Sequence, residues 1–196
     1  RSWLRRYYGD FGAYVARTMT PSMLAYGEAI EEDASAELGE DAAFARVEAW
    51  LHAYATTFGQ DYAARSRGQL DALLDQAIAE ETDPSEAVGT RLDEWESSRP
   101  RKVSHTELTR LAGALVVTVW AGRGVKKIQW VGLGGKECAF CRKLDGRIVG
   151  IEHDFVSQGA DVEGDEQTGS FKADRAYRHP PIHSFCKCGL RAIREG

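Results

Sequence analysis

The sequence reads Cys138-Ala139-Phe140-Cys141 at one point and His183-Ser184-Phe185-Cys186-Lys187-Cys188 at a later one, and these two segments hold all four cysteines of the chain. Two residues between cysteines allow one tight turn to direct both sulfurs to the same point. Zinc binds four such thiolate or imidazole ligands tetrahedrally, at about 2.0 to 2.3 Å. We therefore predict a structural zinc site that joins the segments. Five candidates compete for its four positions: Cys138, Cys141, His183, Cys186 and Cys188.

Three other states of these cysteines are disulfides, buried free thiols and a redox pair. Disulfides need an oxidising compartment, and the sequence shows no secretory hydrophobic segment. Free cysteines are often buried, which makes packed thiols the simplest alternative. A redox Cys-x-x-Cys normally opens a helix after a strand, whereas a Leu144-Asp145-Gly146 turn follows this motif. These considerations favour zinc.

Composition and charge bound the possible functions. With 196 residues and 43% hydrophobic content, the chain is long enough for one core, or for a helical body with a smaller appendage. No apolar run approaches the roughly 20 residues of a spanning helix, so we expect no membrane partner. Residues 1–100 carry 9 basic and 19 acidic side chains, whereas residues 101–196 carry 16 and 11. The two halves therefore differ electrostatically.

A basic region surrounds the first cysteine pair. Its cationic residues are candidates for sequence-independent contacts with the phosphates of double-stranded DNA: Lys126, Lys127, Lys136, Arg142 and Lys143. No basic run exceeds two residues, and the sequence pI is about 5.6. An ordinary solvated surface is therefore the simpler interpretation of these residues.

Residues 1–100 have the periodicity of helices. An aromatic stripe over residues 3–17 predicts an amphipathic helix, whose stripe we expect to pack in the core rather than to dock a partner. Thr20-Pro21 predicts the start of a second helix that Gly39 ends. The longest helical region follows from Asp41, and Pro100 is expected to end a further short helix. No catalytic constellation occurs in this half.

Residues 101–196 combine helix and strand signals. Ser104-His105-Thr106-Glu107 is a capping box that predicts a helix start, and Gly122 is a suitable stop. Residues 125–131 and 147–151 predict a hairpin whose tip carries Cys138 and Cys141. Residues 152–178 show no defensible period and are expected to form a long loop, after which residues 190–193 suit a last strand. The predicted fold is mainly α, with a helical portion over residues 1–100 and a small α+β zinc-knuckle module over residues 101–196.

The region from about residue 101 to residue 193 resembles the Mu F-like minor head protein family of tailed bacteriophages, also called the phage head morphogenesis family. The resemblance lies in pieces that occur in the order of the family: Glu107-x-x-Arg110, a glycine-ended helix, a tryptophan-containing strand, Cys-x-x-Cys, Leu144-Asp145-Gly146, His179-Pro180-Pro181-Ile182-His183 and Cys186-Lys187-Cys188. Ala139 and Ser184 stand where the family commonly has proline, and neither change removes a ligand. Gly113 stands where the family has a polar residue.

This resemblance implies a minor capsid protein of the phage head, associated with the portal protein and other capsid proteins and with DNA packaging and ejection. The implied location is the virion, in the head interior or at the portal vertex, and the host cytoplasm during assembly. The resemblance implies no catalysis and a structural role for zinc. The first hundred residues correspond to a variable helical portion, which we expect to dock on the portal or capsid.

Two alternatives belong to other functional classes. A zinc-stapled nuclease of the His-Asn-His type also places histidines between cysteine pairs, and His179 and His183 would then act in cleavage. The chain contains no asparagine, and its second pair is Cys-x-Cys, so two usual parts of that motif are missing. The second alternative is a non-specific DNA-binding module, which is compatible with a head protein.

Overall fold

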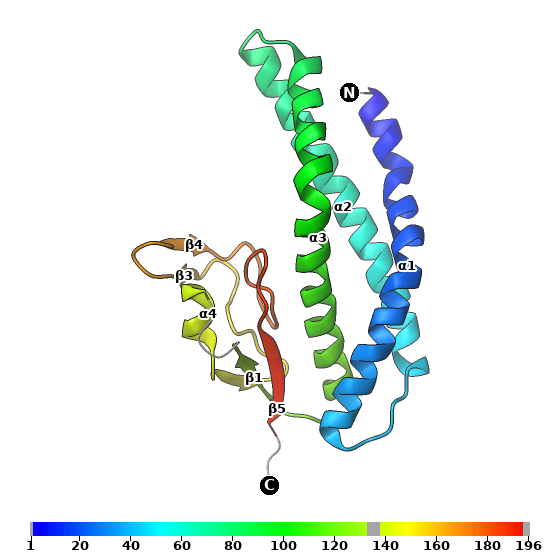
Figure 1. The fold of residues 1–196 in the computed structure, drawn as a ribbon, viewed down its shortest axis with the longest axis vertical. Helices are drawn as coiled ribbons and strands as arrows, with labels where there is room; N and C mark the ends of the chain where they lie inside the picture. Colours follow the sequence, from blue (N-terminus) through cyan, green and yellow to red (C-terminus); the bar gives the residue numbers. More distant parts are fainter. Residues whose placement is uncertain (1, 133–137, 194–196) are drawn as a thin grey trace. The chain divides into compact units, whose positions relative to one another are not determined.

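The structure, a computed structural model, describes residues 2–132 and 138–193. It is mainly helical, with small antiparallel sheets in the C-terminal part of the chain (Figure 1), which confirms the predicted fold class. The chain divides into two compact units. The first comprises Arg1–Glu28 with Phe44–Arg101, and the second comprises Ala29–Ala43 with Lys102–Gly196. The second unit therefore includes a segment that the predicted boundary at residue 100 assigned to the helical portion.

The helical part of the chain is built from three long helices: α1 (Ser2–Leu38), α2 (Ala45–Ala79) and α3 (Pro84–Gly122). Gly39 follows α1 with φ of 69°, a left-handed conformation in which glycine carries no steric penalty. The Asp83 carboxylate accepts a hydrogen bond from the Ser85 amide at 2.8 Å and so caps the first turn of α3. The predicted stops at Gly39 and Gly122 are confirmed.

Two prolines lie inside these helices, and the boundaries predicted from them are wrong. Pro21 is within α1 and Pro100 is within α3. Ser104 is also an interior residue of α3, so the capping box predicted there does not start a helix. A proline removes one helical hydrogen bond and crowds the preceding turn, and surrounding contacts must compensate for that cost.

Arg99 supplies such contacts beside Pro100. Its guanidinium lies 4.1 Å from the ring centroid of Trp95 and 4.4 Å from that of Tyr62. It also donates a hydrogen bond of 2.8 Å to the hydroxyl of Ser66, a fully buried residue of α2. These interactions hold the residue before the proline in the helical conformation that proline otherwise disfavours.

Glycines let α1 and α2 approach each other in the first unit. A Cβ atom added at Gly59 would collide with the carbonyl oxygen of Gly12, and one added at Gly27 would lie 2.6 Å from the Leu51 side chain. Leu51 itself is buried. Gly12 weakens the isolated helix, as the sequence indicated, but it permits close packing of the two backbones.

The aromatic stripe of α1 packs in the core only in part: Phe11 contacts Tyr62 of α2, but three of its rings are exposed. Trp3, Tyr7 and Tyr14 are 64%, 48% and 54% exposed, whereas Leu4 is buried. Trp3 stacks on Tyr7, and Tyr7 stacks on Phe11, with ring centroids 5.2 and 5.4 Å apart. One turn separates successive members, so the rings contact one another along the helix.

The second unit contains a three-stranded antiparallel sheet with strand order β2-β1-β5: β1 (Lys127–Val131), β2 (Ile148–Gly150) and β5 (Gly189–Ile193). The predicted hairpin and last strand are thereby confirmed. Ile128 and Trp130 project from the same face of β1 and are fully buried. A short helix, α4 (Ala139–Leu144), lies in the sequence between β1 and β2 and carries the first cysteine pair.

A second hairpin occupies part of the expected long loop, and sequence analysis missed it. Its strands are β3 (Asp161–Glu163) and β4 (Ser170–Lys172). The Asp165 carboxylate accepts hydrogen bonds from the Thr168 hydroxyl and from the amides of Thr168 and Gln167. These bonds, above all the one from the Thr168 hydroxyl, lower the pKa of Asp165. This Asp-x-x-Thr-Gly turn was the signal available in the sequence.

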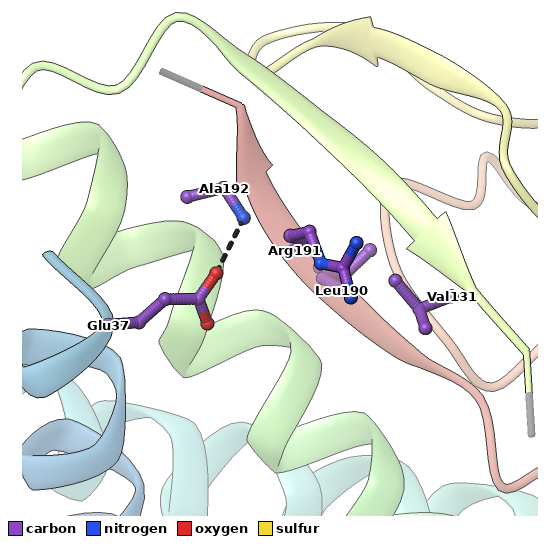
Figure 2. A pocket seen from close by; sticks show the side chains of 5 residues that line it. All are labelled: Glu37, Val131, Leu190, Arg191 and Ala192. Atoms are coloured by element: carbon purple, nitrogen blue, oxygen red, sulfur yellow. Dashed lines mark hydrogen bonds between the residues drawn. The ribbon is translucent and has the colours of Figure 1, made fainter.

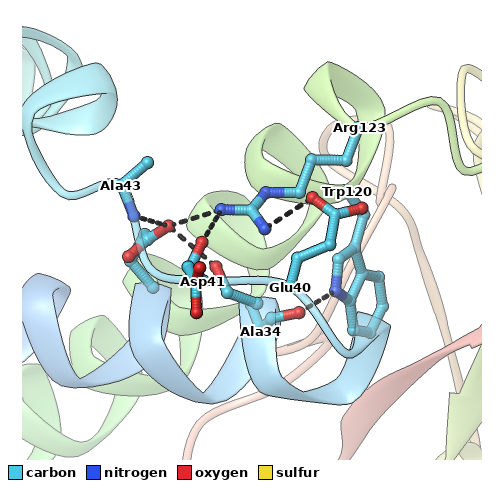
Figure 3. Close-up of polar contacts among 8 residues, drawn as sticks. Ala34, Glu40, Asp41, Ala43, Trp120 and Arg123 are labelled. Carbon is cyan, nitrogen blue, oxygen red and sulfur yellow. Dashed lines mark hydrogen bonds and ion pairs between the residues drawn. The ribbon is translucent and has the colours of Figure 1, made fainter.

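Figure 3 shows how Ala29–Ala43 is held within the second unit. The Arg123 guanidinium contacts the carboxylates of Glu31 at 3.0 Å and Glu40 at 2.8 Å, and the side chains of Arg123 and Glu31 are only 8% and 2% exposed. The Trp120 indole donates a 3.0 Å hydrogen bond to the carbonyl of Ala34. The end of α3 is thus joined to the end of α1 by a buried charge pair and a buried indole.

The outer edge of β5 is partly capped by a side chain. Glu37 accepts a hydrogen bond of 3.0 Å from the Ala192 amide, which points away from β1 (Figure 2). An open pocket of about 680 Å³ lies beside this contact, lined by Glu37, Val131, Leu190, Arg191 and Ala192. The Glu37 carboxylate thus occupies a backbone donor of the edge strand β5 with which another strand would otherwise pair.

Candidate metal centre

The first cysteine pair lies at the start of α4. Cys138 is the residue before the helix and has an extended backbone, and Cys141 is inside the helix and 1% exposed. A helix therefore does open at the Cys-x-x-Cys motif, contrary to the expectation that disfavoured a redox pair. Asp145-Gly146 follows α4 as predicted, and Gly146 has φ of 76°. All four cysteines of the chain are free thiols.

The second segment brings its donors to the first pair. The Nε2 atom of His183 lies 2.9 Å from the sulfur of Cys138 and 3.3 Å from that of Cys141. The sulfurs of Cys141 and Cys186 are 3.6 Å apart. Tetrahedral zinc bonds of about 2.0 to 2.3 Å place neighbouring donors about 3.5 to 3.8 Å apart. The separation of the Cys141 and Cys186 sulfurs matches this spacing, and both distances from His183 are shorter than it.

The five predicted ligands form one cluster with Cys141 at its centre. Two groups of three have donor atoms within 4.8 Å of one another, and both contain Cys141: the group of Cys138, Cys141 and His183, and the group of Cys141, Cys186 and Cys188. Cys186 and Cys188 are buried, with side chains that are 1% and 7% exposed. Among the residues that the structure describes, these are the groups able to hold a metal ion, and the cluster that they form fits a thiolate-binding metal.

The geometry of the His183 ring fixes which nitrogen faces the thiols. Its Nδ1 atom is 2.7 Å from the Ser184 carbonyl oxygen, which can only accept a hydrogen bond. Nδ1 therefore carries a proton, and the lone pair of the neutral ring is on Nε2, the atom directed at Cys138 and Cys141. Metal-binding histidines are commonly oriented by such a hydrogen bond from the other ring nitrogen.

A left-handed residue turns the chain between the donors of the second segment. Phe185 has φ of 61°, and the Cys186 amide donates a 3.3 Å hydrogen bond to the His183 carbonyl. A bulky residue in this conformation costs about 1 to 2 kcal/mol, so other interactions must hold it. The turn directs His183 and Cys186 toward the same point.

The protons of the cluster are unequally held. The pKa of Cys186 is lowered because Cys141, and then Cys188, hydrogen-bond to its sulfur. The hydrogen bond with Cys186, with burial, raises the pKa of Cys141. The hydrogen bond with Cys186 raises the pKa of His183 to about 9. Without metal, these shifts favour negative charge on Cys186 and positive charge on His183.

Helix α3 supports the second segment from outside the cluster. The Thr109 hydroxyl is 3.1 Å from the carbonyl oxygen of Cys186, to which it donates. A Cβ atom at Gly113 would lie 2.7 Å from Nδ1 of His179, so this histidine fills the space of a side chain at position 113. In the two turns of α3 before Gly113, the buried Glu107 pairs with Arg110 at 2.6 Å. No pattern in the sequence indicated that Thr109 supports the cluster.

The predicted DNA-contacting residues have different surroundings. Arg142 pairs with Asp165 at 3.4 Å and Lys143 pairs with Glu163 at 3.1 Å, so acidic residues of the second hairpin partly neutralise α4. Lys126 and Lys127 are exposed at the start of β1. Lys136 lies outside the described residues. A DNA contact by these residues stays a prediction.

Comparison with known proteins found no matching family model, no matching curated protein and no matching solved structure. Among the described residues, no helix has the length and apolar character needed to cross a membrane.

Proposed function

We propose that the second unit is a module stabilised by one structural zinc ion, within a minor head protein of a tailed bacteriophage. The convergence of the two cysteine segments on Cys141 carries the zinc part of this proposal. Soft thiolates with one imidazole are a donor set typical of structural zinc. The ordered motifs from Glu107 to Cys188 support the assignment to head assembly.

A structural role is favoured over a catalytic one by the number of protein donors. A catalytic zinc site keeps a position for water or substrate, whereas a structural site uses four protein ligands. Here two groups of three protein donors share Cys141, which offers more than four protein ligands, and three of these residues, Cys141, Cys186 and Cys188, are buried. Zinc bound there would fasten α4 to the segment that leads into β5.

The zinc part is tested by metal analysis of the whole chain purified without added zinc. We expect about one zinc per chain by mass spectrometry, retained in Ser184→Ala and lost in Cys141→Ser. Ser184 is exposed and contributes its backbone carbonyl, so its variant controls for substitution within the same segment. A folded wild-type chain without metal would refute the proposal.

The assembly part is tested in particles made by the phage or prophage that encodes the chain. We expect a few copies per head, together with the portal protein, and none in heads made with Cys141→Ser. The matched particles carry Ser184→Ala, which should be incorporated normally. Normal incorporation of the cysteine variant would show that the zinc module is dispensable for assembly, and absence of the wild-type chain from heads would refute the role as a head protein.

A further inference from the structure

The indole of Trp130 is a polar group whose hydrogen bond is missing. Trp130 is 0% exposed, and its Nε1 atom is buried without a hydrogen-bond partner in the structure. An unpaired N–H group in the interior costs about 1 to 3 kcal/mol, so proteins rarely keep one without a reason. The other fully described buried indole, that of Trp120, has its partner in the Ala34 carbonyl.

The strand register places a sulfur next to this indole. Trp130 of β1 is opposite Leu190 of β5, and Cys188 immediately precedes β5, two residues before Leu190. A side chain two positions along from the residue opposite an aromatic ring is within reach of that ring. Phe155 packs edge-on against the Trp130 ring at 5.2 Å and helps to fix its orientation.

The charge on Cys188 decides whether this contact is a strong hydrogen bond. Cys188 is buried, and a protonated thiol is only a weak hydrogen-bond acceptor. A metal-bound cysteine is a thiolate, and hydrogen bonds to charged acceptors are about twice as strong as neutral ones.

We infer that Cys188 is one of the four metal ligands and that the Trp130 indole N–H donates a hydrogen bond to its thiolate when the metal is bound. The inference rests on the proposed zinc site and names one of its ligands, with Trp130 as the residue that positions it. Loading the site gives the buried N–H its missing acceptor. Hydrogen bonds of this kind to metal ligands commonly change affinity by about 10- to 100-fold.

Zinc competition against a chromophoric chelator tests the pair, using the whole chain and the variants Trp130→Phe, Cys188→Ser and the double variant. We expect Trp130→Phe to weaken zinc binding by about 10- to 100-fold. Cys188→Ser should also weaken binding, and Trp130→Phe should add nothing in that background. Trp120→Phe is the matched control, because it removes a buried indole whose partner is a backbone carbonyl, and it should leave zinc affinity unchanged.

The absorption spectrum of the cobalt-substituted chain distinguishes a lost hydrogen bond from a change in packing. A hydrogen bond lowers the energy of the sulfur lone pairs, so its loss should shift the thiolate-to-cobalt charge-transfer band to longer wavelength in Trp130→Phe. Benzothienylalanine at position 130, which keeps the bicyclic shape and lacks the N–H, should give the same shift if Trp130→Phe folds poorly. An unchanged band and affinity in a folded variant, or equal losses with and without Cys188, would overturn the inference. A wild-type chain that binds neither metal would instead refute the proposed zinc site.

Discussion

His183 and Cys138 are separated by 45 positions in the sequence, and the Nε2 atom of the histidine lies 2.9 Å from the sulfur of the cysteine. This contact closes a long loop that contains α4, β2 and the hairpin of β3 and β4. A metal bound between its ends would restrict the unfolded chain and contribute its binding free energy to folding. Stability of the second unit should therefore depend on metal.

Removal of zinc should unfold the sheet region of the second unit before the helices of the first. A chelator is expected to lower the protection of the β1 amides against hydrogen exchange, and added zinc should restore that protection. The amides of α2 serve as the internal reference. Protection of β1 that is the same with and without chelator would contradict the prediction.

The pKa of His183 predicts a pH dependence for the metal-free chain. The hydrogen bond with Cys186 raises it from 6.5 to about 9 in the folded state. A raised pKa means that the charged ring adds stability below pH 6.5, and that this contribution is lost as the pH rises through about 9. His183→Gln should therefore lower the thermal midpoint at pH 6 and change it little at pH 10.

The same ring must lose the proton on Nε2 to bind a metal. Zinc binding at pH 7.5 should release protons to the buffer, in smaller number for His183→Gln if His183 is a ligand. Isothermal titration in buffers of different ionisation enthalpy measures this number. Equal proton release by the variant and the wild-type chain would show that the imidazole keeps its proton.

Loss of Arg123 should destabilise the second unit strongly. Arg123→Ala leaves the buried Glu31 carboxylate without its cation, and breaking such a pair costs about 3 to 5 kcal/mol. Arg142→Ala removes an exposed pair and should cost less than about 1 kcal/mol. Urea denaturation followed by Trp120 fluorescence, in chains with the other tryptophans replaced, compares them. Replacing Glu31 and Arg123 together with leucine should be less harmful than Arg123→Ala.

Gly113 should not tolerate a side chain. Gly113→Ala places a Cβ atom 2.7 Å from His179 and 2.9 Å from the Pro180 carbonyl, and this overpacking should cost about 1 to 3 kcal/mol. Gly89→Ala is the control in the same helix, because nothing lies within 4 Å of its added atom. Alanine there should stabilise α3 by up to about 1 kcal/mol. Equal thermal midpoints for the two variants would contradict this account.

The sequence predicted the parts of the fold that local patterns determine. Alternation over residues 125–131 predicted the strand that the structure shows as β1, and Gly39 and Gly122 marked helix ends. Cysteine spacing identified the five members of the cluster. The strand and the helix ends depend on residues that are close together in the sequence. The cluster was predictable because few residue types other than cysteine and histidine bind zinc.

The errors came from contacts between residues far apart in the sequence. Pro100 was expected to end a helix, because the contacts of Arg99 with Tyr62 and Ser66 of another helix cannot be predicted from the local sequence. The aromatic stripe that includes Tyr7 was expected in the core, because helical periodicity does not show which face of the helix is exposed to solvent. The hydrogen bond missing at Trp130 is visible only once the register of β1 and β5 is known.

The interleaving of the two units has a consequence for inheritance. Glu31 and Ala34 are encoded upstream of most of the first unit, yet their partners Arg123 and Trp120 are encoded downstream of it. A genetic exchange with its crossover near codon 101 would combine an arginine and an indole with acceptors selected in another lineage. Exchanges that replace only codons 44–101 keep both pairs intact. We therefore expect sequence variation between relatives to be freest in that interior block, with residues 29–43 and 102–123 inherited together.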